Sequence, residues 1–359
     1  STFDMPNVNP NMTTMELLTE RNQLGAEKSW TNYSYYFGAM ETNLEEIKKL
    51  DPKETCGLKV FMGTSTGTLL VEDDHALEQI FEHCPVTIVT HCEDNETILE
   101  NYHKVKAKYG DKIPVSMHPS IRSADACEKS TRLAISLAQE YDSDLHVLHI
   151  STAQELKLFS NAPIEKKRIT AEVCVHHLWF NQDDYSELGN LIKCNPAIKT
   201  KFDQQALIEA VNSNKLDIIA TDHAPHTIEE KMGNYSKAPA GIPLVQHSLL
   251  TLIDHFKKGS DVLFDIDWQG AKQLKKSSFK NIISIFIVPP SKDAIYKRLK
   301  SRAITSGDNE KAIENRMNKY ETEMRHKNDY DYLVINDKLE TCVDELEKII
   351  NNKRSSLVD

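Results

Sequence analysis

The sequence predicts an α/β protein of two units, a parallel barrel over residues 1–258 and a smaller α/β segment over residues 259–359. Short apolar runs alternate with amphipathic segments as far as about residue 250. Polar side chains follow the carboxyl ends of those runs, and the pattern changes after residue 260. A chain of 359 residues also suits two domains better than one.

The strand candidates of the first unit are short, apolar and rich in β-branched residues. They are Thr2–Met5, Gly57–Met62, Val86–Thr90, Leu145–Ile150, Ile169–Val175 and Leu216–Ala220. Helices are expected between several of them, at His75–Glu82, Glu96–Tyr109, Ala124–Tyr141 and Asp203–Asn212. Because apolar strands alternate with helices, we expect a parallel sheet with both faces covered.

Polar or ionisable groups lie at or just past the carboxyl ends of these strands, and Lys59 lies within its own. The groups are Asn7, His91, His149, His176, His177 and Asp222. A parallel α/β barrel carries its catalytic groups at that end, and a doubly wound sheet also binds ligands there. We prefer the barrel because such side chains follow nearly every strand and no Gly-rich phosphate loop is present.

A different pattern begins after residue 260. Strands are expected at Asp261–Asp267, Asn281–Val288 and Tyr332–Ile335, and helices at about Lys292–Arg302, Asn309–Lys327 and Lys338–Asn351. Thirteen of the 14 histidines lie at or before His255. No Pro/Gly/Ser-rich linker marks the change, which falls near Lys257-Lys258-Gly259.

Composition argues against several classes of function. A net charge of −11 disfavours a general nucleic-acid binder. No apolar run reaches the roughly 18 residues of a membrane span. The first residues, Ser1-Thr2-Phe3, do not resemble a signal peptide, and we expect the sequence to begin inside a longer chain. Seven cysteines without C-x-x-C spacing indicate reduced thiols and a cytoplasmic location.

Three strand ends carry groups that zinc favours, namely His91, His149 and Asp222. A single histidine at a strand end is more often structural. Three such ends in successive strand–helix repeats favour a metal site.

Seven motifs, in order, resemble the dihydroorotase family of metal-dependent cyclic amidohydrolases. They are Met5–Asn7, Leu58–Gly63, Thr90–Glu93, His146–Ser151, Lys193–Lys199, Thr221–His226 and Ala238–Pro243. The resemblance implies an incomplete (β/α)8 metal-dependent hydrolase barrel that closes N-carbamoyl-aspartate to dihydroorotate, reversibly, in pyrimidine biosynthesis. Its partner would be that small molecule, with a homo-oligomer left open.

The resemblance also implies roles for the ligands. Lys59 would be carboxylated and would bridge two metal ions, which the resemblance implies to be zinc. The alternative is a lysine that is buried in an ion pair or that extends its amine to solvent. His91 and His149 would bind the second ion. Asp222 would bind the first ion and act as general acid and base.

Substrate contacts follow from the same motifs. Asn7, Asn195 and His226 would hold the substrate. Arg122, in Pro-Ser-Ile-Arg-Ser, also recurs in the family, although a surface or helix-capping role is an equal alternative.

One departure from the family is plain in the sequence. The family's first barrel strand ends in His-x-His, which supplies two ligands to the first metal ion, and this chain contains no His-x-His. We expect the first strand and the closing segment of the barrel to be absent. The chain alone is therefore expected to be inactive or weak.

Residues 259–359 resemble the C-terminal half of a guanylate kinase, a partial P-loop-kinase-like α/β segment. The matching motifs are Asp261–Ala271, Ile285–Ser291, Arg298–Arg302, Glu314–Met317 and Tyr330–Asp337. Asp265 and Asp267 would serve Mg²⁺ or a guanine edge. Phosphates would meet Arg298, Arg302 and Arg316, and Asn336 would lie beside adenine.

The phosphate-cradling string G-x-x-x-x-G-K-[ST] is absent from the sequence, so kinase activity is not expected. The favoured interpretation is a chimera of two partial proteins. The alternatives are a nucleotide-binding module for ATP or GMP with a degenerate barrel as scaffold, and a non-catalytic interaction protein.

Overall fold

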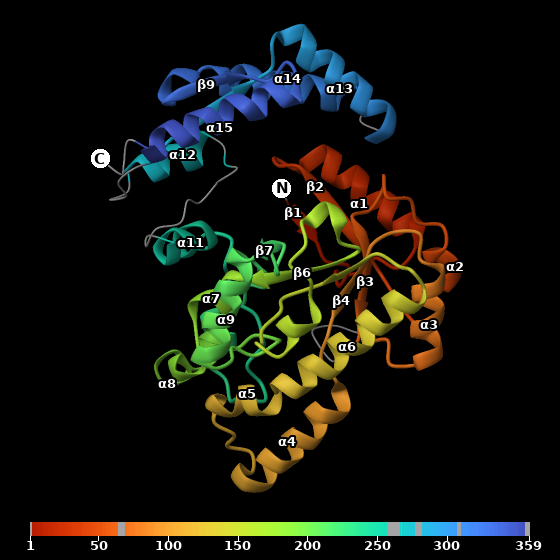
Figure 1. Ribbon diagram of the computed structural model, residues 1–359. Helices are drawn as coiled ribbons and strands as arrows, with labels where there is room; N and C mark the ends of the chain where they lie inside the picture. The colour runs from red at the N-terminus through yellow and green to blue at the C-terminus, as the bar shows by residue number, and fades with distance from the viewer. Residues whose placement is uncertain are drawn as a thin grey trace. The chain divides into compact units, whose positions relative to one another are not determined.

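The chain forms two compact units, Ser1–Asp261 and Val262–Asp359, and each is described by itself (Figure 1). The computed structural model describes residues 2–63, 69–256, 266, 268–276, 282–306 and 310–355. No helix among those residues is both long enough and apolar enough to cross a membrane.

Seven parallel strands form one curled sheet in the first unit, and their order in the sheet is their order in the chain. They are β1 Thr2–Asp4, β2 Tyr33–Gly38, β3 Gly57–Phe61, β4 Ile88–His91, β5 Leu145–Val147, β6 Ile169–Cys174 and β7 Ile218–Ala220. Within the described residues β1 and β7 are the two edges. This arrangement is an incomplete (β/α)8 barrel, as the sequence predicted.

Helices connect the strands and cover the outer face of the sheet (Figure 1). The longer ones are α1 Met15–Lys28, α3 Asp74–His83, α4 Asn95–Tyr109, α6 Ala124–Glu140, α9 Lys201–Asn212 and α11 Ser248–Phe256. Five of these six begin at a Thr, Asp or Ser whose side chain accepts a hydrogen bond from a backbone N–H of the first turn. Such caps fix where a helix starts, because they satisfy donors that have no partner inside the helix.

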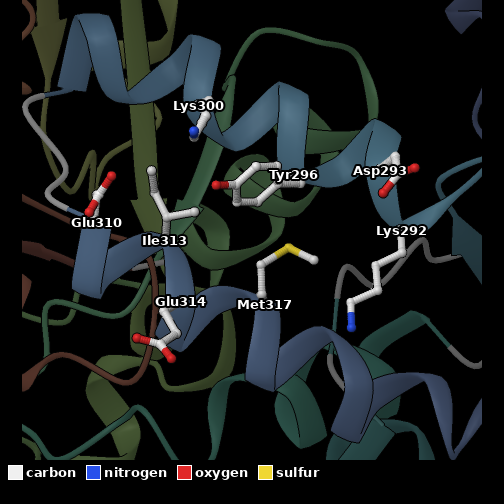
Figure 2. Close-up of a pocket in the computed structure, with 8 residues that line it drawn as sticks. All are labelled: Lys292, Asp293, Tyr296, Lys300, Glu310, Ile313, Glu314 and Met317. Atoms are coloured by element: carbon white, nitrogen blue, oxygen red, sulfur yellow. The ribbon is translucent and has the colours of Figure 1, made fainter.

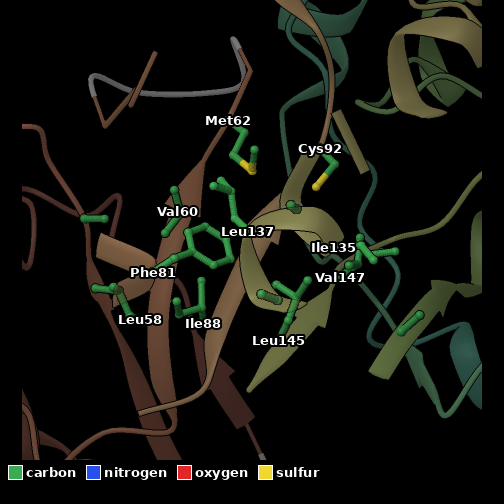
Figure 3. Packing of buried hydrophobic residues seen from close by; sticks show 14 of the residues in the cluster. Leu58, Val60, Met62, Phe81, Ile88, Cys92, Ile135, Leu137, Leu145 and Val147 are labelled. Atoms are coloured by element: carbon green, nitrogen blue, oxygen red, sulfur yellow. The ribbon is translucent and has the colours of Figure 1, made fainter. Parts of the chain in front are cut away.

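The hydrophobic core lies between the sheet and these helices (Figure 3). In β3, Leu58 and Val60 point into it, and Phe81 of α3 packs there too. Strand side chains alternate between faces, so Lys59 lies on the opposite, inner face of the sheet. Polar residues of the strands can therefore gather inside the barrel without interrupting the apolar layer.

The second unit contains a small parallel sheet of β8 Ile285–Val288 and β9 Tyr332–Ile335. Its helices are α12 Trp268–Lys276, α13 Lys292–Ser306, α14 Glu310–Met324 and α15 Leu339–Ser355. The strand predicted at Asp261–Asp267, apart from Ile266, and the predicted join near residue 258 lie outside the described residues.

Candidate metal-binding active site

The four predicted metal ligands come from four different strands of the first unit. Lys59 is the middle residue of β3 and His91 the last of β4, while His149 and Asp222 each lie two residues past a strand, β5 and β7. His91 Nδ1 and His149 Nε2 are 2.9 Å apart. Lys59 and Asp222 lie close enough that each shifts the pKa of the other. The parallel sheet thus brings the four side chains toward one mouth.

Backbone geometry at two of these positions is unusual. His149 has φ of 38° and Asp222 has φ of 42°, both in the left-handed region that residues other than glycine seldom adopt. Such conformations are costly and tend to cluster at functional sites. At both positions the left-handed backbone sets the direction of a predicted ligand side chain just after its strand ends.

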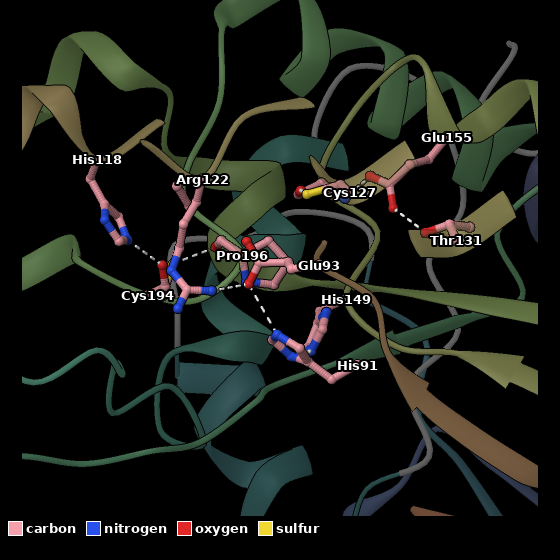
Figure 4. Close-up of polar contacts among 12 residues, drawn as sticks. His91, Glu93, His118, Arg122, Cys127, Thr131, His149, Glu155, Cys194 and Pro196 are labelled. Atoms are coloured by element: carbon pink, nitrogen blue, oxygen red, sulfur yellow. Dashed lines mark hydrogen bonds and ion pairs between the residues drawn. The ribbon is translucent and has the colours of Figure 1, made fainter. Parts of the chain in front are cut away.

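A buried network supports His91 (Figure 4). The His91 Nε2–H group donates to Glu93 at 3.0 Å, and Arg122 forms an ion pair with the same carboxylate. Burial alone would raise the pKa of Glu93, but the Arg122 charge and the hydrogen bond from His91 hold it at about 2. Since an ionised carboxylate only accepts, Nε2 of His91 carries the proton and Nδ1 presents a lone pair.

A glycine lets the chain approach this network closely. A Cβ atom at Gly63 would lie only 2.0 Å from the backbone oxygen of Glu93. Any larger residue would displace the loop that carries the carboxylate, so the Met62-Gly63 step after β3 helps to position Glu93.

Lys59 is buried and forms no hydrogen bond or ion pair within the described part of the chain. Its Nζ lies 4.4 Å from the centre of the Phe61 ring. Burial lowers the pKa of the ammonium to about 8, although the nearby Asp222 carboxylate opposes that shift. A buried cationic amine without a partner is costly, and its neutral form is the one that reacts with CO₂ to give a carbamate.

Asp222 is half-buried as a residue, but its carboxyl group lies in the interior. Burial and, to a smaller extent, the nearby Glu172 raise the pKa of that group to about 6, although Lys59 opposes the shift. At neutral pH the group is therefore mainly ionised but close to its midpoint, which suits proton transfer.

The donors fit a zinc-type ion. Two nitrogens bound to one tetrahedral zinc lie about 3.3 Å apart, and His91 Nδ1 and His149 Nε2 are 2.9 Å apart with one proton between them. Burial lowers the pKa of both histidines, so both are neutral. The Glu93 carboxylate accepts a hydrogen bond from Nε2 of His91, and carboxylates orient metal-binding histidines in the same way in other proteins. Sequence reasoning assigned Glu93 no role, although it follows His91 by two residues.

The predicted substrate contacts have mixed surroundings. The Asn195 Oδ1 atom is buried without a hydrogen-bond partner in the described structure. His226 Nε2 lies 3.3 Å from the Ala240 carbonyl oxygen, and Asn7 is half-buried in the loop after β1. Arg122 is engaged with Glu93, which favours a supporting role. All four remain predicted substrate residues.

Among the predicted nucleotide contacts, the structure joins two. Arg298 of α13 donates to the backbone oxygens of Asn336 and Asp337, at 3.0 and 3.2 Å. Arg316 lies on α14. Asp265, Asp267 and the Arg302 side chain lie outside the described residues, so the Mg²⁺ prediction stays a prediction.

A cavity of about 450 Å³ lies between α13 and α14 (Figure 2). Its lining includes Lys292, Tyr296 and Met317 but none of the three predicted arginines. The cavity therefore adds nothing to the predicted phosphate contacts.

Comparisons with known proteins find relatives of two kinds. The dihydroorotase of Methanosphaera stadtmanae is 30% identical over 287 residues, which cover 80% of this chain and 63% of that protein. The dihydroorotase of Anoxybacillus flavithermus is 39% identical over 189 residues, 52% of this chain and 42% of that one. The first unit is dihydroorotase-like. The family model for guanylate kinase matches residues 247–353, so the second unit is guanylate kinase-like.

Solved structures agree on the fold of the dihydroorotase-like unit. The L-hydantoinase (dihydropyrimidinase) from Arthrobacter aurescens has a TM-score of 0.66 at 24% identity and covers 72% of this chain and 58% of its own. Dihydroorotase from Saccharomyces cerevisiae, in complex with 5-fluoroorotic acid, has a TM-score of 0.56 at 19% identity and covers 71% and 70%. This chain spans between 42% and 65% of the length of the curated dihydroorotases.

Proposed function

We propose that the dihydroorotase-like unit is a metal-dependent cyclic amidohydrolase that interconverts dihydroorotate and N-carbamoyl-aspartate. Lys59, His91, His149 and Asp222 would surround the metal centre. The observation that carries the proposal is the 2.9 Å approach of two buried, neutral imidazoles, one of them held from behind by Glu93. The names of the curated relatives support the substrate.

Zinc bound here would polarise the ring amide carbonyl and acidify the attacking water. Lys59, as a carbamate, would add an oxygen ligand to the two imidazoles. Its pKa of about 8 leaves a fraction of neutral amine at physiological pH, and that amine can take up CO₂.

Asp222 would move the proton. With a pKa of about 6, its carboxylate can accept a proton from the attacking water and return it to the departing ring nitrogen. Asn195 Oδ1, which has no hydrogen-bond partner among the described residues, would accept a hydrogen bond from a substrate N–H group. Asn7 and His226 would complete the pocket.

Turnover by this chain is proposed to be weak. The sequence offers no His-x-His pair for a second zinc ion, so one ion would hold the water that two ions hold in the family. We therefore expect the chain to bind zinc and to hydrolyse dihydroorotate slowly.

The test compares zinc content and dihydroorotate hydrolysis in the full chain and in His149→Ala. We expect the variant to lose one zinc ion per chain and all measurable hydrolysis. The matched control is His103→Ala on the exposed face of α4, which should change neither quantity. Labelling with ¹³C-bicarbonate should give a carbamate signal that Lys59→Ala removes.

Zinc content that is equal in the full chain and in His149→Ala, or hydrolysis that His149→Ala leaves unchanged, would overturn the proposed metal site. Turnover as fast as that of a complete dihydroorotase would overturn only the proposal that the chain is weak, which rests on the absence of His-x-His from the sequence.

A second candidate function, nucleotide binding by the guanylate kinase-like unit, is favoured by the family match over residues 247–353. Calorimetric titration with ATP and GMP tests it. Binding that Arg316→Ala weakens would support it, and no heat with either nucleotide would exclude it.

A further inference from the structure

Three metal-ligating side chains gather at the end of β6, and none has a role in the proposed reaction. Cys174 is the last residue of β6, and His176 and His177 lie in the first turn of α7 (Val175–Trp179). One donor atom from each lies within 4.8 Å of the other two, and all three residues are buried. Donors around one zinc ion lie roughly 3–4 Å apart, so small side-chain rotations would close the set.

The histidines have free ring nitrogens in an interior where polar atoms are normally paired. Neither Nδ1 nor Nε2 of His176 has a hydrogen-bond partner in the described part of the chain. His177 Nε2 lies 3.1 Å from the Pro196 carbonyl oxygen, which can only accept, so Nε2 carries the proton. Nδ1 of His177 therefore presents a lone pair, and this atom is also buried with no hydrogen-bond partner among the residues that the structure describes.

This arrangement is how metal-binding histidines are oriented, with the outer N–H on a carbonyl and the inner lone pair toward the ion. Burial lowers the pKa of His176 to about 3 and lowers that of His177 as well, so both rings are neutral, as ligands must be. Cys174 is a free thiol with no disulfide partner.

His176 separates the cluster from a cavity of about 470 Å³ whose other walls include His226, Lys231 and His247. Because His176 is the member of the cluster that lines this cavity, we expect a metal ion to reach the site from that side when the His176 ring rotates.

We propose that Cys174, His176 and His177 form a separate binding site for a borderline transition-metal ion such as zinc, with an open fourth position. A thiolate with two imidazoles selects such ions over Mg²⁺ or Ca²⁺. The site adjoins the centre at Lys59 but differs from it in chemistry, because the proposed ligands there are nitrogen and oxygen only.

Cobalt(II) titration of the full chain tests the site. A cysteine ligand gives a thiolate-to-cobalt charge-transfer band in the near ultraviolet, which a site of nitrogen and oxygen ligands cannot give. We expect the band in the unmodified chain and its loss in Cys174→Ser. It should persist in Cys127→Ser, an equally buried cysteine on α6, and in His149→Ala, which removes a ligand of the other centre.

A second variant and a second measurement keep the test decisive if Cys174→Ser fails to fold. His176→Gln should keep the band and weaken cobalt binding at least tenfold. X-ray absorption at the zinc edge of the unmodified protein should show one sulfur at about 2.3 Å. Absence of both the band and the sulfur, a band that survives Cys174→Ser, or a band lost in His149→Ala would overturn the proposal.

Discussion

Glu93 is a single side chain that takes part in two interactions, with the His91 ring and with the Arg122 guanidinium. Its exposed fraction is 0%. A buried carboxylate is tolerated only when its charge is compensated. The position of His91 therefore depends on a residue that itself touches no proposed substrate.

Replacing Arg122 with Met should leave the Glu93 charge buried and uncompensated. We expect a loss of about 3–5 kcal/mol in the free energy of unfolding, measured by urea denaturation. Arg132→Met is the control, because Arg132 pairs with Glu128 on the exposed face of α6 and should contribute less than about 1 kcal/mol. Equal effects of the two changes would contradict a supporting role for Arg122.

His118 gives the stability of the first unit a dependence on pH. Its ring nitrogens contact the Tyr235 hydroxyl at 2.9 Å and the Cys194 carbonyl oxygen at 2.8 Å. Burial, with the nearby Arg122 charge, lowers the pKa of His118 to about 3 from its usual 6.5. Folding therefore requires the neutral ring, and its contribution to stability is complete above pH 6.5 and declines as the pH falls toward 3.

His118→Gln should remove one buried histidine from that acid response. Between pH 6 and 4, stability should fall less steeply in the variant, by up to about 1.4 kcal/mol per pH unit. Chemical denaturation at several pH values measures the slopes. His103→Gln, on an exposed face, should keep the original slope, and a similar change in that control would refute the assignment.

The four proposed ligands could be predicted from the sequence because each follows or lies in a recognisable strand motif. Their surroundings could not. The pairing of Glu93 with Arg122, 29 residues away, and the left-handed backbone at His149 and Asp222 depend on packing between distant segments. Local sequence carries no signal for either.

At the scale of elements, α9 begins with a reciprocal cap that also contacts a neighbouring loop. The Thr200 side chain accepts from the Asp203 N–H group, and the Asp203 carboxylate accepts from the Thr200 N–H group. Asp203 also accepts from the Ala153 N–H group at 2.8 Å, which ties the helix to the segment after β5. The cap thus fixes a helix and a neighbouring loop together.

Thr200→Ala should cost about 1 kcal/mol of stability, as the loss of an N-cap usually does. Thermal or urea unfolding measures it. Thr19→Ala, in the exposed middle of α1, should lie within about 0.5 kcal/mol of the unmodified chain. If the cap contributed nothing, the two variants would have equal free energies of unfolding.

Strands could be predicted where aliphatic residues dominate, as in β3 and β4. The aromatic strand β2, Tyr-Ser-Tyr-Tyr-Phe-Gly, was missed because its first four residues are only half-buried and its pattern resembles neither a helix nor an apolar run. Helix α12 was missed as well. It begins at Trp268, directly after the residues where the sequence predicts a strand, Asp261–Asp267.

At the scale of the whole first unit, the sheet has two edges within the described residues. All three residues of β1 are exposed, and Phe3 and Ile218 expose 57% and 44% of their surface. Unpaired strand edges with apolar side chains favour pairing with another chain. The order of the strands could be predicted from the barrel resemblance, because in a barrel chain order and sheet order coincide.

Self-association through β1 is therefore expected at high protein concentration. Phe3→Lys should reduce it, since charged residues on an edge strand oppose pairing. Analytical ultracentrifugation measures the mass. Leu99→Lys, at a 56% exposed position on α4, is the control and should leave association unchanged. Association that neither change affects would point to another surface.

The alternating faces of β3 have an evolutionary consequence. A substitution at Lys59 would alter the proposed metal site and leave the apolar layer intact, whereas a substitution at Leu58 or Val60 would alter the apolar layer. A protein that lost its activity through substitutions on the inner face alone would keep its fold. A few substitutions on that face could then restore the activity.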